Sequence, residues 1–336
     1  MRILRDQPAT HKRFQIKIKG CKMLILKKFF TIIPILLFVI STSLVNASNL
    51  PEKLLNIPIS LTSGEVVTLK QYQGKKPVYL KFWATWCVPC RKQMPHFEHI
   101  AKQYNGDLEV IAINLGINDD LAAIEKIQQE FGLSMPMAID KNGDLAQAFR
   151  LLGTPYHLLF DKQMNLVHIG HEADSTLDNK IALISQNQRI DLLADSAISE
   201  TAAPLTLNLN DGQSHALFFT ATWCDWYLKD SRPAVSQQCI MAQQTVNKLS
   251  QQMDGIVWQG VISRLWTGDA ELAAYAKKYN IPYPTAVDAS NQLFHQFAVK
   301  DLPTLVIVKN NQVVFSTSDF SDVNLLTKQL STLVIE

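Results

Sequence analysis

Two cysteines separated by two residues could carry redox chemistry. Cys87 and Cys90 stand in the segment Trp86-Cys87-Val88-Pro89-Cys90, where an apolar run gives way to a helical pattern. The first sulfur would then lie at a helix N-terminus, where unpaired N–H groups and the helix dipole favour a thiolate over a thiol. A thiolate attacks a disulfide to form a mixed disulfide, which a second sulfur one turn further along can resolve. Cys87 is the predicted nucleophile and Cys90 the predicted resolving cysteine.

The same spacing also supplies half of many zinc sites, which need a second pair of ligands. His96 and His99 lie nearby in the sequence, but both belong to an amphipathic helical pattern in which exposed histidines are ordinary. The strand-to-helix setting of the cysteines and the later Thr154-Pro155 favour redox chemistry instead. We expect neither a metal nor a cofactor.

The elements around the cysteines predict strands and helices that alternate in a parallel arrangement. The apolar run Val78–Trp83 is typical of a central strand, and Pro95 should kink or restart the helix that follows the cysteines. The other predicted elements are strands at 57–61, 66–69, 108–114 and 137–140, helices from Asp119 or Asp120 through 131 and at 144–149, a hairpin of 156–161 with 166–170, and a helix at 175–188.

The second half of the chain repeats this order. Ala84-Thr85-Trp86-Cys87 recurs as Ala221-Thr222-Trp223-Cys224, and the proline that opens an apolar stretch recurs as Pro303. The separation of cysteine and proline is 68 residues in the first half (155 − 87) and 79 in the second (303 − 224). We expect the eleven extra residues (79 − 68) to fall after Pro233, around Cys239.

The stretch from about residue 50 to residue 188 resembles the thioredoxin superfamily, most closely the exported TlpA/ResA-like thiol-disulfide reductases. The resemblance is carried by Phe82 to Cys90, by Pro95, by Met135-Pro136 before a strand and by Gly153-Thr154-Pro155. It implies that Pro155 is cis, and that Trp86, Thr154 and Pro155 line a groove for an extended substrate segment beside the nucleophile. The predicted fold is α/β, with two tandem thioredoxin-like domains at 48–190 and 204–336, each a central mixed sheet flanked by helices, and a linker at 191–203.

Two positions depart from the pattern of this family. Six residues before Cys87, where thioredoxins place a buried acid that assists proton transfer, the chain has Lys81. A lysine near the sulfurs would favour the thiolate, but we expect its side chain to extend to the edge of the strand and into solvent. Gln93 stands where many relatives carry glutamate, so we assign no acid–base role to that position.

In the second half, Cys224 aligns with the predicted nucleophile, but Tyr227 occupies the resolving position. Cys239 lies fifteen residues after Cys224, too far along a straight helix but within reach if the intervening segment folds back. We expect a disulfide between these two cysteines. It could be structural or a second redox centre, and we favour the structural role. Trp223 and Pro303 predict a second peptide-binding groove.

The N-terminal segment has the pattern of an export signal. Residues 1–28 carry nine Lys or Arg and one Asp, a net charge of +8. The formal net charge of the whole chain is +2, so the remaining residues carry about −6 (+2 − 8), which does not favour binding to nucleic acid. The apolar run Phe29–Ile40, followed by Val45-Asn46-Ala47, predicts a leader at 1–47 that is cleaved after Ala47, with a retained membrane anchor as the alternative. Met23 would be a more conventional start than Met1. Four cysteines follow the leader, the even number that disulfide pairing needs.

These features predict a periplasmic thiol-disulfide oxidoreductase that reduces disulfides in exported proteins. A membrane electron donor is implied, because an oxidising compartment does not regenerate a dithiol unaided. Val88-Pro89 is closer to the Gly-Pro of reducing thioredoxins than to the Pro-His of strong oxidants. The alternatives are a disulfide oxidase or isomerase and, from a different class, a redox-inert binding protein or chaperone.

Overall fold

The computed structural model describes residues 50–188, 190–193 and 203–335, which belong to one compact unit. The predicted leader, its two candidate start sites and most of the predicted linker lie outside the described residues. We call residues 50–193 the N-terminal half and residues 203–335 the C-terminal half. Within these ranges, no helix combines the length and the apolar character needed to cross a membrane.

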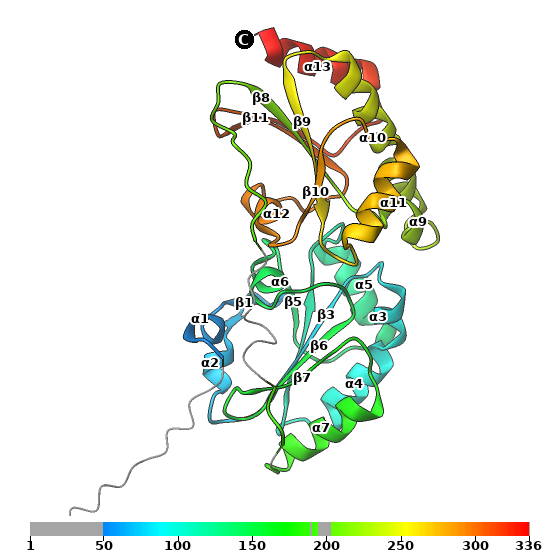
Figure 1. Cartoon of the computed structure of the whole chain (residues 1–336). Helices are drawn as coiled ribbons and strands as arrows, with labels where there is room; N and C mark the ends of the chain where they lie inside the picture. Colours follow the sequence, from blue (N-terminus) through cyan, green and yellow to red (C-terminus); the bar gives the residue numbers. More distant parts are fainter. Residues whose placement is uncertain (1–49, 189, 194–202, 336) are drawn as a thin grey trace, which may run out of the picture. The chain divides into compact units, whose positions relative to one another are not determined.

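Each half contains a five-stranded mixed sheet, and the two sheets have the same strand order (Figure 1). In the N-terminal half the order is β5-β4-β3-β6-β7, with β3, β4 and β5 parallel and β6 and β7 antiparallel to their neighbours. The strands are β3 (Val78–Trp83), β4 (Glu109–Asn114), β5 (Met137–Ile139), β6 (Tyr156–Phe160) and β7 (Leu166–Gly170), and a short antiparallel pair is formed by β1 (Ile59–Ser60) and β2 (Val66–Val67).

The sheet of the C-terminal half repeats this arrangement as β10-β9-β8-β11-β12. Again the first three strands in this order are parallel and the last two are antiparallel to their neighbours. The strands are β8 (Ser214–Thr220), β9 (Ile256–Ser263), β10 (Thr285–Asp288), β11 (Thr304–Lys309) and β12 (Gln312–Thr317). The predicted fold class, two tandem thioredoxin-like α/β domains, is confirmed.

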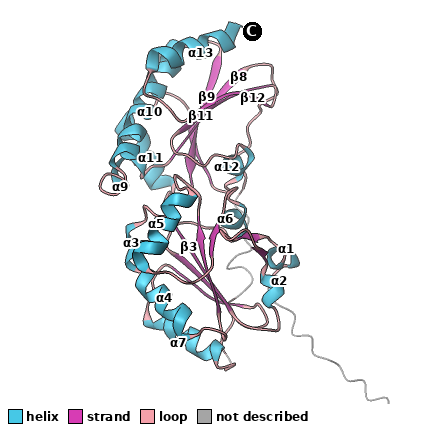
Figure 2. Cartoon of the chain, turned by 180° about the vertical axis from the view of Figure 1, so that it is seen from behind, coloured by secondary structure: helices cyan, strands magenta, loops and turns pink. Residues whose placement is uncertain are grey.

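Helices flank both sheets. In the N-terminal half, α1 and α2 lie on the opposite side from α4 and α7, and in the C-terminal half α12 lies opposite α9, α10 and α11 (Figures 1 and 2). The helices are α1 (Glu52–Leu55), α2 (Leu69–Tyr72), α3 (Val88–Lys92), α4 (Met94–Gln103), α5 (Leu121–Phe131), α6 (Asp144–Ala148), α7 (Ser175–Ser185), α9 (Cys224–Tyr227), α10 (Pro233–Gln252), α11 (Asp269–Tyr279), α12 (Gln292–Gln296) and α13 (Val323–Ile335).

Local sequence signals set several helix ends. Asp120 caps α5 by accepting the N–H of Ala123 at 2.8 Å, and Gly132 ends that helix in the left-handed conformation with φ 61°. α7 ends at Ser185, earlier than predicted, because Asn187 adopts a positive φ of 56° that a right-handed helix cannot continue through.

The helix after the cysteines is divided as predicted. α3 ends and α4 begins at Gln93, and Pro95 occupies the first turn of α4, where its missing N–H costs no hydrogen bond. The corresponding helix of the C-terminal half, α10, has 20 residues against 10 in α4. This confirms that the extra residues of the second half fall after Pro233.

The central strands supply the buried core that positions the site. Every residue of β3 and of β8 is buried, as expected for strands with a neighbour on both sides and helices on both faces. Each of these strands ends a few residues before a cysteine, Cys87 after β3 and Cys224 after β8. The cysteines are therefore held at equivalent ends of two equivalent sheets.

Candidate active site

The two cysteines of the first motif form a buried disulfide. Cys87 is the N-cap residue of α3, and its Sγ accepts the N–H of Cys90 at 3.2 Å. The Cα atoms of the pair are 5.2 Å apart, and both residues are fully buried. The structure thus holds the oxidised state of the pair, with the sulfur of Cys87 at the start of the helix, where a backbone donor can stabilise a thiolate.

A loop with a cis peptide bond accompanies each cysteine helix. The peptides Thr154–Pro155 and Leu302–Pro303 are both cis, as the resemblance implied for Pro155. The carbonyl of Pro155 accepts a hydrogen bond from Nδ1 of His171 at 2.7 Å. Thr154 is buried, and its hydroxyl has no hydrogen-bond partner among the described residues.

A chain of hydrogen bonds runs from the buried face of β3 to this loop. The hydroxyl of Tyr79 contacts His157 Nδ1 at 2.6 Å, and His157 Nε2 contacts the amide oxygen of Gln93 at 2.9 Å. Because that oxygen only accepts, Nε2 carries the proton and Nδ1 accepts from Tyr79. Gln93 also donates to the carbonyl of His171 at 3.1 Å. Gln93 therefore positions the loop partner of Pro155, a role that its side-chain type alone did not indicate.

The surroundings of His157 disfavour a positive charge on its imidazole. Burial, and then the nearby Lys81, hold the pKa of His157 well below its usual range. A neutral imidazole is what the hydrogen-bond pattern requires. His157 is consequently suited to orienting its neighbours and not to serving as a cation beside the sulfurs.

The prediction that Lys81 extends into solvent is wrong. Its side chain is fully buried, and Nζ lies 5.2 Å from the centroid of the Phe97 ring with no hydrogen-bond partner among the described residues. Burial lowers its pKa from 10.5 to about 7. β3 is the central strand with β4 and β6 on its two sides, and the Phe97 ring of α4 lies over Lys81 Nζ, so the side chain reaches neither a strand edge nor an open face of the sheet.

The C-terminal half covers Trp86, the residue before Cys87. Trp86 stacks on Trp223 with ring centroids 5.0 Å apart, and the rings of Trp266 and Tyr227 meet it edge-on at 6.0 and 6.4 Å. Trp86 is 1% exposed. Such aromatic pairs stabilise a contact by about 0.5–1.5 kcal/mol each beyond the area that they bury. Tyr227, which occupies the resolving position of the second motif, therefore acts as packing for the first.

An ion pair adds a polar contact beside this cluster. The guanidinium of Arg232 lies 3.0 Å from the carboxylate of Asp119 and also donates to the hydroxyl of Thr85. The side chain of Asp119 is fully buried and also accepts the N–H of Thr85 at 2.7 Å and the amide of Asn114 at 2.8 Å. Of the two candidate helix caps in the sequence, Asp120 is the cap and Asp119 faces this contact.

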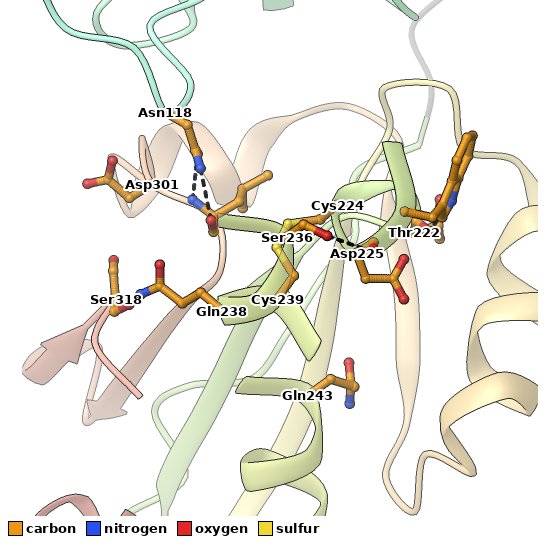
Figure 3. Close-up of a disulfide and its surroundings, with 12 residues drawn as sticks. Asn118, Thr222, Cys224, Asp225, Ser236, Gln238, Cys239, Gln243, Asp301 and Ser318 are labelled. Atoms are coloured by element: carbon orange, nitrogen blue, oxygen red, sulfur yellow. Dashed lines mark hydrogen bonds between the residues drawn. A yellow bond between two sulfur atoms is a disulfide. The ribbon is translucent and has the colours of Figure 1, made fainter. Parts of the chain in front are cut away.

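Each half also binds the proline loop of the other. The N–H of Asn118 donates to the carbonyl of Lys300 at 2.9 Å, and its side chain exchanges hydrogen bonds of 3.0 and 2.8 Å with the backbone of Leu302 (Figure 3). Reciprocally, the N–H of Trp266 donates to the carbonyl of Leu152 at 2.7 Å. Lys300 and Leu152 are each three residues before a cis proline, so the two contacts are equivalent.

The predicted second groove is not open in this arrangement. Trp223 and Pro303 are both buried. Sequence reasoning did not find Asn118, Arg232 or Trp266. The signal that the sequence offered was position, because Asn118 and Trp266 each follow an equivalent strand. The structure adds that both residues adopt positive φ angles, 52° and 48°.

The cysteines of the C-terminal half are also joined. Cys224 begins α9 and Cys239 lies in α10, and the structure links them in a buried disulfide with Cα atoms 6.0 Å apart (Figure 3). Ser236 Oγ donates to the carbonyl of Asp225 at 2.8 Å, a second bond between the same two helices. The disulfide thus fixes the start of α10 against α9.

Comparison of the chain with known proteins identifies its family. The Redoxin family model matches residues 50–183. Thioredoxin-like protein YneN of Bacillus subtilis is 32% identical over 124 residues, 36% of this chain and 72% of that protein. The chain belongs to the thioredoxin-like redoxin family. Thiol-disulfide oxidoreductase ResA of Bacillus anthracis, another relative, is 30% identical over 133 residues, 39% of this chain and 75% of that protein.

Other similarities are more limited in extent. The match to ResA of Bacillus thuringiensis subsp. konkukian is 31% identical and spans 33% of this chain and 64% of that protein's length. Among solved structures, StoA from Bacillus subtilis is 20% identical, covers 37% of this chain and 92% of its own, and has a TM-score of 0.32. The redoxin match ends at residue 183, so the C-terminal half lies beyond it.

Proposed function

We propose that this chain is a thiol-disulfide oxidoreductase in which Cys87 is the nucleophile and Cys90 resolves. The observation that carries the proposal is the disulfide Cys87–Cys90 at the start of α3. The cis-Pro155 directly precedes β6, and β6 is the neighbour of β3, the strand that leads to Cys87. Trp86 and Thr154 complete the proposed substrate-binding residues. Relatives named ResA thiol-disulfide oxidoreductase support this activity.

In the reducing direction, the reduced pair transfers two electrons to a substrate disulfide. The Cys87 thiolate attacks one substrate sulfur, forms a mixed disulfide and releases the other substrate sulfur as a thiolate, which takes up a proton. The Cys90 sulfur, as thiolate, then attacks Cys87 and releases the second substrate thiol. The net result is one substrate disulfide reduced to two thiols and one Cys87–Cys90 disulfide formed.

We propose the reducing direction, with disulfides of exported proteins as substrates and the periplasm as the compartment. The export pattern of the N-terminal sequence supports the location, and Val88-Pro89 supports the direction. Each cycle leaves the pair oxidised, so a donor of two electrons is needed, and in an oxidising compartment a membrane protein would supply them. Cys224–Cys239 is proposed to be structural, because it joins two helices within one half.

The test of this function is the reduction potential of Cys87–Cys90 in the purified protein, measured by equilibration with dithiothreitol or glutathione buffers. A value of about −270 mV supports a reductase, whereas one of about −120 mV makes the protein an oxidant. A Cys90→Ser variant should accumulate the mixed disulfide of Cys87 with substrate, and Cys87→Ser should not. If the pair does not titrate and Cys87→Ser keeps full activity as a holdase, the protein is a redox-inert chaperone.

A further inference from the structure

A pocket opens beside the covered disulfide. It has a volume of about 500 Å³ and lies between the cysteine motif and the aromatic cluster of the C-terminal half. We call it the aromatic pocket, and its defining residues are Pro89, Thr154, Trp223, Trp226, Tyr227 and Trp266. Pro89 stands between the two cysteines and Thr154 precedes the cis proline, so the pocket borders both parts of the proposed active site.

Most of the pocket surface is apolar, and each of its two charged side chains, Glu271 and Lys278, has a partner. The carboxylate of Glu271 at its rim accepts the N–H of Gly268 at 2.9 Å and so caps α11. The ammonium of Lys278 is 2.6 Å from the carboxylate of Asp225. Trp226 is 60% exposed although it is the largest kind of apolar side chain. An uncharged, apolar ligand that stacks on indole rings matches these walls.

The size and position of the pocket favour an extended segment of a client polypeptide as its ligand. Both cysteines are fully buried, so any client must displace covering side chains to reach them, and an extended segment needs a smaller displacement than a folded surface. The aromatic pocket is open to solvent next to those sulfurs and can take a side chain projecting from a single strand. A client whose disulfide approaches Cys87 past Thr154 would bring its neighbouring residues to the mouth of the pocket.

Resting on the proposed function, we propose that the aromatic pocket binds a large apolar side chain, preferably aromatic, next to the disulfide of an extended client polypeptide. The C-terminal half thereby sets the substrate preference of a dithiol that the N-terminal half carries. Trp226 and Trp266 are the specificity-determining residues, because they contribute ring surface from the C-terminal half and take no part in sulfur chemistry.

The test compares two synthetic peptides that each contain one intramolecular disulfide and differ only in a Trp or a Ser beside it. The full chain reduces both peptides with dithiothreitol as the electron donor, and KM and kcat are measured separately. We expect KM for the Trp peptide to be at least tenfold lower, with similar kcat. The variants Trp226→Ser and Ala274→Arg should each raise KM for the Trp peptide to that of the Ser peptide.

Two controls make the result decisive. Leu325→Ser removes an apolar side chain of similar exposure, 53%, from α13 and should keep the preference for the Trp peptide. Ala274→Arg introduces a large side chain at the pocket mouth from an exposed helical position. It tests the pocket independently if the loss of Trp226 disturbs folding. Equal KM values for both peptides with the unmodified protein would refute the proposal that the aromatic pocket binds a client side chain, and would leave the proposed function unaffected. Turnover of neither peptide would remove both proposals.

Discussion

Replacing the buried Lys81 by methionine should stabilise the protein, most strongly at neutral and acidic pH. Its pKa is about 7 in the folded chain, against 10.5 when it is unperturbed. The folded state therefore binds fewer protons than the unfolded state between these values, so the free energy of unfolding of the natural protein rises with pH in that window. The ionic cost of Lys81 is complete below pH 7 and disappears above pH 10.5.

The size of the effect follows from the same linkage. Each unit of pKa difference corresponds to about 1.4 kcal/mol, so the cost is on the order of 4 kcal/mol at pH 7 and about 2 kcal/mol at pH 9. Methionine preserves an unbranched side chain of similar length and leaves no amine without a partner. The expected gain of Lys81→Met in free energy of unfolding should therefore shrink by about half between these two pH values.

Urea unfolding of both proteins at pH 6, 7, 8 and 9, with the disulfides intact, measures this difference directly. The matched comparison is Tyr79→Phe, which alters a neighbouring position on the same face of β3 and is not expected to reproduce the steep decline between pH 7 and pH 9. A gain that is constant over the whole range, or a Lys81→Met variant less stable than the natural protein, would refute the argument. A constant gain would mean that Lys81 does not titrate in this range, and a less stable variant would mean that methionine packs in the site less well than lysine.

Three further predictions concern the contact between the halves and the second disulfide. Arg232→Met leaves the buried Asp119 carboxylate without its cation and should lower the free energy of unfolding, by less than the about 3–5 kcal/mol typical of a fully buried pair, because Arg232 is partly exposed. The reduced Cys87 should then react at least several-fold faster with iodoacetamide, and an unchanged rate would contradict the covering role. Gly153→Ala should act in the same direction, because its Cβ would come 2.3 Å from Trp266 Nε1, and a second change of Trp266→Ala should relieve the clash as measured by thermal unfolding. Cys224→Ser should lower stability by roughly 3 kcal/mol in the chain-entropy model while turnover remains, and lost turnover at unchanged stability would indicate an electron relay.

Much of the local structure could be derived from the sequence because it depends on near neighbours. The run Val78–Trp83 is apolar at every position except Lys81, which is typical of a strand buried on both faces, and the structure has a strand with those bounds. Pro95 forced a helix restart at Gln93, since a proline cannot donate the hydrogen bond that a continuous helix needs. The repeated motif around Cys224 predicted a second domain of the same kind, and the structure has a second sheet with the same strand order as the first.

The fate of Lys81 could not be derived in this way. The sequence places an ionisable residue in a strand, and its side chain could reach solvent only past an uncovered face of the sheet or a free strand edge. Phe97 of α4 covers that face at Lys81. Whether β3 has a free edge depends on β4 and β6, which come from segments up to 82 residues away, as in the pairing of Val78 with Phe160. The partners of a strand are chosen by the whole chain, so tertiary structure alone decided that this lysine is buried.

The sequence by itself determined the reactive pair, because the chemistry of Cys87 and Cys90 depends on two sulfurs three positions apart at the start of one helix. Only the tertiary structure decided what surrounds that pair. Trp86 contacts Trp223, and Asp119 contacts Arg232, although more than a hundred residues of sequence separate the partners. No local sequence pattern predicts either contact. The physical reason is that helix and strand signals act over a few residues, whereas the complementarity of two surfaces exists only after both have folded.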